Sequence, residues 1–145
     1  MLEEKQVTDL LRERGFKVTP QRLAVYKVLS GTTAHPNAEA IYNKLQPKYP
    51  TMSLATVYKT LDILSELGLV QVLNVGEESF RYDANTESHP HVHCTSCGRV
   101  DDIFGVDDAG FMSEVSSKTA YSLESKQFYF YGICPDCQKK LKKIN

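Results

Sequence analysis

The sequence predicts an α+β fold made of two small domains. Three observations support this prediction: apolar residues recur at helical spacing through the first 70 residues, a hairpin pattern follows them, and the remaining chain is rich in cysteine, histidine and β-prone residues. A chain of 145 residues can form two small hydrophobic cores. We expect a first domain at residues 1–83, a polar hinge at residues 84–88 and a second domain at residues 89–145.

Four helices are expected in the first domain, because each apolar stripe has its own start or stop signal. The fourth stripe, from Leu54 to Leu67, places its apolar residues three or four positions apart, which is typical of one buried helix face. Polar residues that cap helix starts and glycines that end helices flank these stripes. These flanking residues are Gly15, Thr19 with Pro20, Gly31, Asn37, Ser53 and Gly68.

A β-hairpin is expected after the helices. Residues 69–75 and 80–83 flank the turn Gly76-Glu77-Glu78-Ser79. Helices followed by a hairpin are the order of a winged helix-turn-helix, in which one helix enters the DNA major groove and the hairpin braces the backbone. The second domain should contain strands with histidine and cysteine, a helix near residues 106–118, a strand near 128–133 and a basic terminal helix.

Charge is unevenly distributed along the chain. Seven basic residues and one acidic residue lie between Arg14 and Thr60, although the net charge of the whole chain is −1. A basic first domain is consistent either with an ordinary solvated surface or with nucleic-acid binding. The N-terminus lacks the features of a secretory signal, and no apolar run approaches membrane-spanning length, so we expect a cytoplasmic protein without a membrane partner.

The four cysteines form two matched pairs, Cys94-x-x-Cys97 and Cys134-x-x-Cys137. In the cytoplasm they should stay reduced, and two such pairs supply the four thiolates of a closed structural zinc site. A thioredoxin-like redox pair is an alternative, but it needs a motif at a helix N-terminus in a βαβ setting, which we expect for neither pair. A zinc deaminase is a second alternative, but it needs a His-x-Glu motif, which the sequence does not contain.

Histidines alternate at His89, His91 and His93, so they share one face if this stretch is extended. Asp83 and Asp102 are nearby in sequence. A mixed nitrogen and oxygen donor set suits iron(II), manganese(II) or zinc, and without thiolate it should bind an exchangeable ion. His35 stands alone before Pro36, and a single histidine in a turn is usually just exposed.

Several motifs together resemble those of the ferric uptake regulator family. They are Thr19-Pro20-Gln21-Arg22, Ala34-His35-Pro36, Ser53-Leu54-Ala55-Thr56-Val57-Tyr58, the His-x-His before Cys-x-x-Cys-Gly, and Tyr131-Gly132-Ile133-Cys134. The resemblance covers nearly the whole chain. It implies a dimeric, metal-responsive repressor of double-stranded operator DNA rather than an enzyme, with an N-terminal winged helix-turn-helix domain and a C-terminal α/β dimerisation domain.

The resemblance also implies which residues carry these functions. A regulatory Fe²⁺ or Mn²⁺ would join both domains of a subunit, and a structural Zn²⁺ would be held by the four cysteines. The regulatory ligands would be His35, Asp83, His89, His91 and Asp102. The DNA-contacting residues would be Ser53, Ala55, Thr56, Tyr58 and Lys59 on the fourth helix, with Lys17 and Arg22 on the DNA backbone or minor groove.

Within that family the sequence is most similar to the peroxide-sensing branch. Asp102 stands where iron-uptake regulators tend to carry Glu, and Lys126 stands where a second metal site of the iron-uptake type would want a histidine. This similarity implies iron-catalysed oxidation of His35 or His89 by peroxide. His93 is an extra imidazole, and Lys59-Thr60 differs from the Asn-Asn of some peroxide repressors. An iron- or zinc-responsive uptake repressor and a zinc-stabilised protein-interaction module remain as alternatives.

Overall fold

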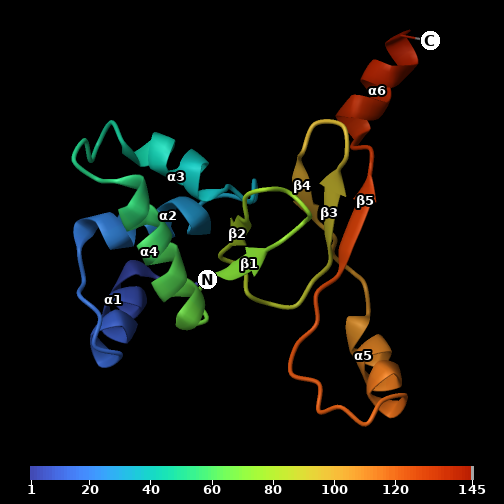
Figure 1. Ribbon diagram of the computed structural model, residues 1–145, viewed down its shortest axis with the longest axis horizontal. Coiled ribbons are helices and arrows are strands. Elements are labelled where there is room, and N and C mark those ends of the chain that lie inside the picture. The colour runs from blue at the N-terminus through green and yellow to red at the C-terminus, as the bar shows by residue number, and fades with distance from the viewer. Residues whose placement is uncertain (145) are drawn as a thin grey trace. The chain divides into compact units, whose positions relative to one another are not determined.

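The protein consists of two compact units. The computed structural model describes residues 1–144, and it divides into an N-terminal unit from Met1 to Thr86 and a C-terminal unit that begins at Glu87 (Figure 1). The division lies within the stretch expected to be a hinge. Ala84, at the start of that stretch, packs in the core of the N-terminal unit.

The N-terminal unit contains four helices followed by a two-stranded hairpin, as predicted. The hairpin, here called the wing, consists of two antiparallel strands in which Gln71 lies opposite Asp83. No element intervenes between the last helix and the wing, which is the order of a winged helix-turn-helix. The elements are α1 (Glu4–Glu13), α2 (Pro20–Ser30), α3 (Ala38–Leu45), α4 (Leu54–Glu66), β1 (Gln71–Leu73) and β2 (Arg81–Asp83).

Local capping explains where these helices begin and end. The side chains of Thr19, Asn37 and Ser53 each accept a backbone N–H three residues along, which satisfies a donor that the first turn leaves unpaired. Gly15 and Gly68 follow α1 and α4 with φ angles of +79° and +71°. Glycine adopts this left-handed conformation without the penalty that a Cβ atom brings, so the chain can turn there.

The core of the N-terminal unit fixes which face of α4 is available to a partner. Val57, Leu61 and Leu64 are fully buried against the other helices, and burial of each such side chain contributes about 1.5–3 kcal/mol. Tyr58 and Lys59 therefore lie on the opposite, exposed face. This is the exposed face that the helical periodicity of the sequence predicts.

The C-terminal unit is built on a three-stranded sheet of order β4-β3-β5, with α5 and α6 at opposite ends of the sheet (Figure 1). β3 pairs antiparallel with β4 and parallel with β5, which places His91 between Asp102 and Tyr129. No residue of α5 is buried. The elements are β3 (His91–Cys94), β4 (Val100–Asp102), α5 (Asp108–Ser117), β5 (Tyr129–Gly132) and α6 (Pro135–Ile144).

The buried apolar residues of this unit gather at the cysteines. Cys94, Cys134 and Cys137 form its cluster of buried residues, and Val100 is buried beside them on β4. A unit with so small a core needs a further source of stability, such as a bound metal or a partner subunit. In the described part of the chain, residues 1–144, no helix has the length and apolar character needed to cross a membrane.

Candidate metal centres and nucleic-acid interface

Four cysteine sulfurs converge in the C-terminal unit. The Sγ atoms of Cys94, Cys97, Cys134 and Cys137 all lie within 4.8 Å of one another, and those of Cys97 and Cys134 are 3.8 Å apart. All four are free thiols. The first pair lies on the turn between β3 and β4, where Gly98 donates its N–H to the carbonyl of Cys94. Four sulfurs gathered from two segments match the donor set of a closed tetrahedral zinc site.

Contacts within this cluster shift the pKa values of two of its cysteines in opposite directions. The backbone N–H of Cys134 donates to the Sγ of Cys94 at 3.2 Å, and this bond is the main reason that the pKa of Cys94 is lowered to about 6. Ser96 lowers the pKa of Cys137, but the neighbouring sulfurs, Cys134 foremost, and burial together raise it to about 11. Four thiolates in contact repel one another, and a divalent cation removes that repulsion.

The position of the second cysteine pair corrects one expectation. Cys134 immediately precedes α6 and Cys137 lies in its first turn, so this motif does stand at a helix N-terminus. Pro135 at the first helical position is the sequence signal for that helix start. The redox alternative is still disfavoured, because the sulfurs of both pairs meet in one cluster.

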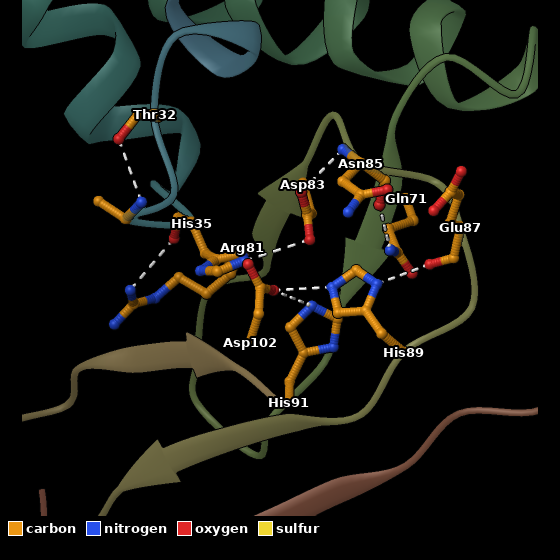
Figure 2. Close-up of polar contacts among 11 residues, drawn as sticks. Thr32, His35, Gln71, Arg81, Asp83, Asn85, Glu87, His89, His91 and Asp102 are labelled. Carbon is orange, nitrogen blue, oxygen red and sulfur yellow. Dashed lines mark hydrogen bonds and ion pairs between the residues drawn. The ribbon is translucent and has the colours of Figure 1, made fainter. Parts of the chain in front are cut away.

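Two histidines of the C-terminal unit converge on one carboxylate (Figure 2). The Nε2 atoms of His89 and His91 lie 2.7 Å and 3.2 Å from Oδ1 of Asp102, and the two rings are 4.4 Å apart. The pairing of β3 with β4 places His91 directly opposite Asp102. Sheet register therefore brings His91 and Asp102 together at one end of the sheet, and His89, which lies just before β3, adds a third donor.

The ring of His89 is oriented by atoms outside this group of donors. Its Nδ1 lies 2.6 Å from the carbonyl oxygen of Glu87, and because a carbonyl only accepts, Nδ1 carries the proton. This leaves Nε2 directed at Asp102, which is the arrangement of a metal-binding imidazole with its other nitrogen held by an acceptor. Phe104 stacks on the same ring, with centroids 5.5 Å apart.

A second group of donors lies in the N-terminal unit. The Nε2 of His35 lies 3.2 Å from Oδ2 of Asp83, which joins the turn between α2 and α3 to the wing. His35 is buried, unlike an ordinary turn histidine, and its φ angle is +50°. A residue with a side chain rarely adopts that left-handed conformation, and it persists only where the surroundings hold it.

Strand β2 holds this strained turn. The guanidinium of Arg81 donates to the carbonyl of His35 at 3.2 Å (Figure 2). The N–H of Tyr82 donates to the carbonyl of Pro36 at 3.1 Å. Glu77 fixes the guanidinium through two further bonds, of 2.9 Å and 3.1 Å. Arg81 was not among the residues predicted from the sequence, although it lies two positions before the predicted ligand Asp83.

The extra histidine lies outside both groups of donors described in the C-terminal unit. His93 packs its ring edge-on against Tyr131, with centroids 6.0 Å apart, and it is not part of the cluster of four sulfurs. Lys126 is held by Asp108 in an ion pair of 3.0 Å. Lys126, which stands where a second metal site would want a histidine, is therefore paired with a carboxylate.

Some of the residues expected to contact DNA have exposed side chains, and others already form hydrogen bonds within the protein. Ala55, Tyr58 and Lys59 are exposed on α4, and Lys17 is exposed in the loop before α2. Ser53 is exposed, but its hydroxyl caps α4 and lies 3.0 Å from that of half-buried Thr56. Arg22 is also half-buried and donates to the carbonyl of Lys17 at 2.7 Å, so it shapes that loop.

The Ferric uptake regulator family is the family whose sequence model matches this chain, over residues 13–131. The protein belongs to the Ferric uptake regulator family. The transcriptional regulator PerR of Clostridium acetobutylicum is 55% identical over 134 residues, covering 92% of this chain and 97% of that protein.

Two solved structures of the family are similar to this one. The peroxide stress regulator of Campylobacter jejuni superposes with a TM-score of 0.70 at 33% identity, covering 94% of this chain and all of the other. The ferric uptake regulator Fur of Helicobacter pylori, described as having three functional metal binding sites, gives a TM-score of 0.79 at 25% identity, covering 92% and 90% of the two chains.

Proposed function

We propose that this family member is a metal-dependent transcriptional repressor that binds operator DNA as a homodimer in the cytoplasm and is released from DNA by peroxide. The observation that carries the proposal is the convergence of His89, His91 and Asp102 on one point, with the Nδ1 of His89 already protonated toward a carbonyl. Family membership and similarity to PerR and to a peroxide stress regulator support it.

The zinc site is proposed to be structural. Four sulfurs occupy every position of a tetrahedral zinc ion, so no position remains for a substrate or an exchangeable ligand. The cysteines join the β3–β4 turn to the start of α6. Binding of zinc would therefore contribute directly to the folding of a unit whose own apolar core is small.

The regulatory ion is proposed to take ligands from both units. The N-terminal unit offers His35 and Asp83, and the C-terminal unit offers His89, His91 and Asp102. Neither set alone completes the coordination of a divalent ion, and the donor types fit Fe²⁺ or Mn²⁺. An ion bound by both sets would favour one relative position of the two units over all others, and so would select the form that binds DNA.

Homodimer formation is supported by apolar surface on the C-terminal unit. Val106, Phe111, Phe130 and Tyr131 are exposed, and a groove of about 300 Å³ runs between α5 and the sheet. Exposed apolar surface of this kind indicates a protein partner, and a second copy of the chain is the partner typical of a symmetric DNA-binding protein. Such a dimer would present two α4 helices to half-sites about 34–36 Å apart.

Peroxide is proposed to act on the histidine ligands. Iron(II), when bound, would supply the electrons that break the O–O bond. Overall, one ring C–H of His35 or His89 gains an oxygen atom and one hydrogen peroxide becomes water, a two-electron oxidation of the imidazole. An oxidised ring binds the ion more weakly. The ion then no longer links the two units, and the DNA-binding form is no longer favoured.

The test is DNA binding measured by mobility shift with manganese or iron, before and after brief peroxide treatment. We expect both metals to promote binding to an operator-length duplex and only the iron form to lose it. If the iron form still binds DNA after peroxide treatment, the peroxide-sensing proposal fails and the iron-uptake repressor takes its place. DNA binding that does not depend on added metal would contradict the regulatory site itself, and a lack of DNA binding with every metal would favour a protein-interaction module.

A further inference from the structure

A polar cluster ties three segments of the C-terminal unit together. The Nζ of Lys126 lies 3.0 Å from Oδ2 of Asp108 and donates to the Asp108 carbonyl at 3.3 Å. The hydroxyl of Ser88 donates to the same carboxylate oxygen at 2.8 Å. Asp108 begins α5, Ser88 lies next to the start of the unit, and Lys126 lies in the segment that leads into β5.

The carboxylate at the centre of this cluster is held in its charged form. Lys126, and after it the Ser88 hydroxyl, lowers the pKa of Asp108, so the ion pair is complete at neutral pH. The side chains of Lys126 and Asp108 are only 21% and 19% exposed. Water screens a pair at this depth less than it screens an exposed one, which makes the contact more specific than a surface ion pair.

His89 needs such an anchor more than the other two donors of its unit do. His91 and Asp102 lie within β3 and β4 and are positioned by strand pairing. His89 lies before β3 begins, and the carbonyl of the next residue, Pro90, is held by the N–H of Ile103 at 2.9 Å. Ser88 is the residue on the other side. The chain on the two sides of His89 is therefore held by one backbone bond, at Pro90, and by the Ser88–Asp108 contact.

We propose that Lys126 is a positioning residue for the regulatory metal: by fixing Asp108, and through it Ser88, it holds the chain so that His89 directs Nε2 into the metal site. This inference rests on the proposed function for the identity of the site. It adds a residue far from the ligands in sequence, which touches neither the ion nor an imidazole. The carbonyl that lies against the Nδ1 of His89 belongs to Glu87, the residue next to Ser88.

The experiment compares Lys126→Met, which removes the charge, with Lys126→Arg, which keeps it. Lys140→Met, at an exposed lysine of α6, is the matched control, and Ser88→Ala removes the other half of the contact. The first measurement is the ¹H–¹⁵N spectrum of the His89 ring in the zinc-loaded, manganese-free full chain. We expect a single set of ring signals, with the Nδ1–H hydrogen-bonded, in the wild type, Lys126→Arg and Lys140→Met, and more than one set in Lys126→Met and Ser88→Ala.

The second measurement is manganese affinity by titration. We expect Lys126→Met to raise the Kd about threefold to tenfold, less than the loss of a group bonded directly to a ligand. Wild-type manganese binding with unchanged His89 spectra and affinity in both Lys126→Met and Ser88→Ala would overturn the positioning role and leave the proposed function standing. If the wild type binds no manganese, the proposed function fails, and the ring spectra alone then decide whether Lys126 orients His89.

Discussion

The Nε2 of His35 lies 3.2 Å from Oδ2 of Asp83, although 48 positions separate the two residues in the sequence. The contact joins a turn between helices to the last residue of the wing. Because β2 also holds the backbone on both sides of the turn, the imidazole and the carboxylate are brought together before any ion binds. Preorganised donors bind an ion without first ordering the chain.

Replacing His35 should separate regulation from folding. We expect His35→Ala to weaken manganese-dependent DNA binding by tenfold or more, which corresponds to about 1.4 kcal/mol. Zinc content and dimer formation should stay at wild-type values, because both depend on the other unit. Mobility shifts with and without manganese measure the effect, and Thr33→Ala in the same loop is the control. Manganese-dependent binding of wild-type strength in His35→Ala would remove this residue from the site.

Loss of one zinc ligand should unfold the C-terminal unit or dissociate the dimer. Cys134→Ser removes a sulfur that lies 3.8 Å from the Sγ of Cys97, while the backbone N–H that bonds to Cys94 stays in place. The expected result follows because the binding energy of a thiolate zinc site contributes directly to folding. Zinc analysis, circular dichroism and sedimentation measure the three consequences. A Cys134→Ser protein that is folded, dimeric and free of zinc would contradict a structural role.

Chelation should distinguish the two metals. Brief treatment with EDTA should abolish DNA binding while zinc stays bound, because four thiolates bind zinc far more tightly than imidazoles and carboxylates bind manganese or iron. Binding should return when manganese is added back. Metal analysis beside each mobility shift provides the check. Simultaneous loss of zinc and DNA binding, without recovery on manganese, would mean that one site serves both roles.

Tyr58→Ala and Lys17→Ala should weaken DNA binding in different ways. Tyr58→Ala should weaken specific binding more than binding to random DNA, because Tyr58, on the exposed face of α4, is expected to contact a base. Lys17→Ala should weaken both and reduce the salt slope by about one, as expected for one lost phosphate contact. Affinities measured on operator and random duplexes at several salt concentrations test both. Equal losses on the two duplexes for Tyr58→Ala would refute its role in base recognition.

Peroxide should oxidise histidine rather than cysteine. After brief treatment of the iron form, we expect one added oxygen on peptides containing His35 or His89, because groups bound to the ion are nearest to the oxidant. The manganese form should show none, since manganese(II) does not readily undergo that one-electron chemistry. Mass spectrometry of digested protein detects the added mass. Oxidation confined to the cysteine peptides would place the sensor at the zinc site instead.

Much of the architecture could be predicted from the sequence because its signals are local. The caps at Thr19, Asn37 and Ser53 and the glycines after α1 and α4 act within one or two helical turns. The stripe on α4 separates a buried face from the face that carries Tyr58 and Lys59 in the same local way. Two Cys-x-x-Cys pairs likewise specify a donor type and spacing that few sites other than zinc use.

The tertiary structure alone decided how the donors are held. Strand register sets His91 opposite Asp102, and Arg81 and Lys126 act on residues 46 and 18 positions away. These features follow from packing energies summed over many residues of a unit, whereas helix caps, apolar periodicity and motif spacing are set by neighbours along the chain. The sequence alone therefore predicts candidate ligands but not the residues that orient them.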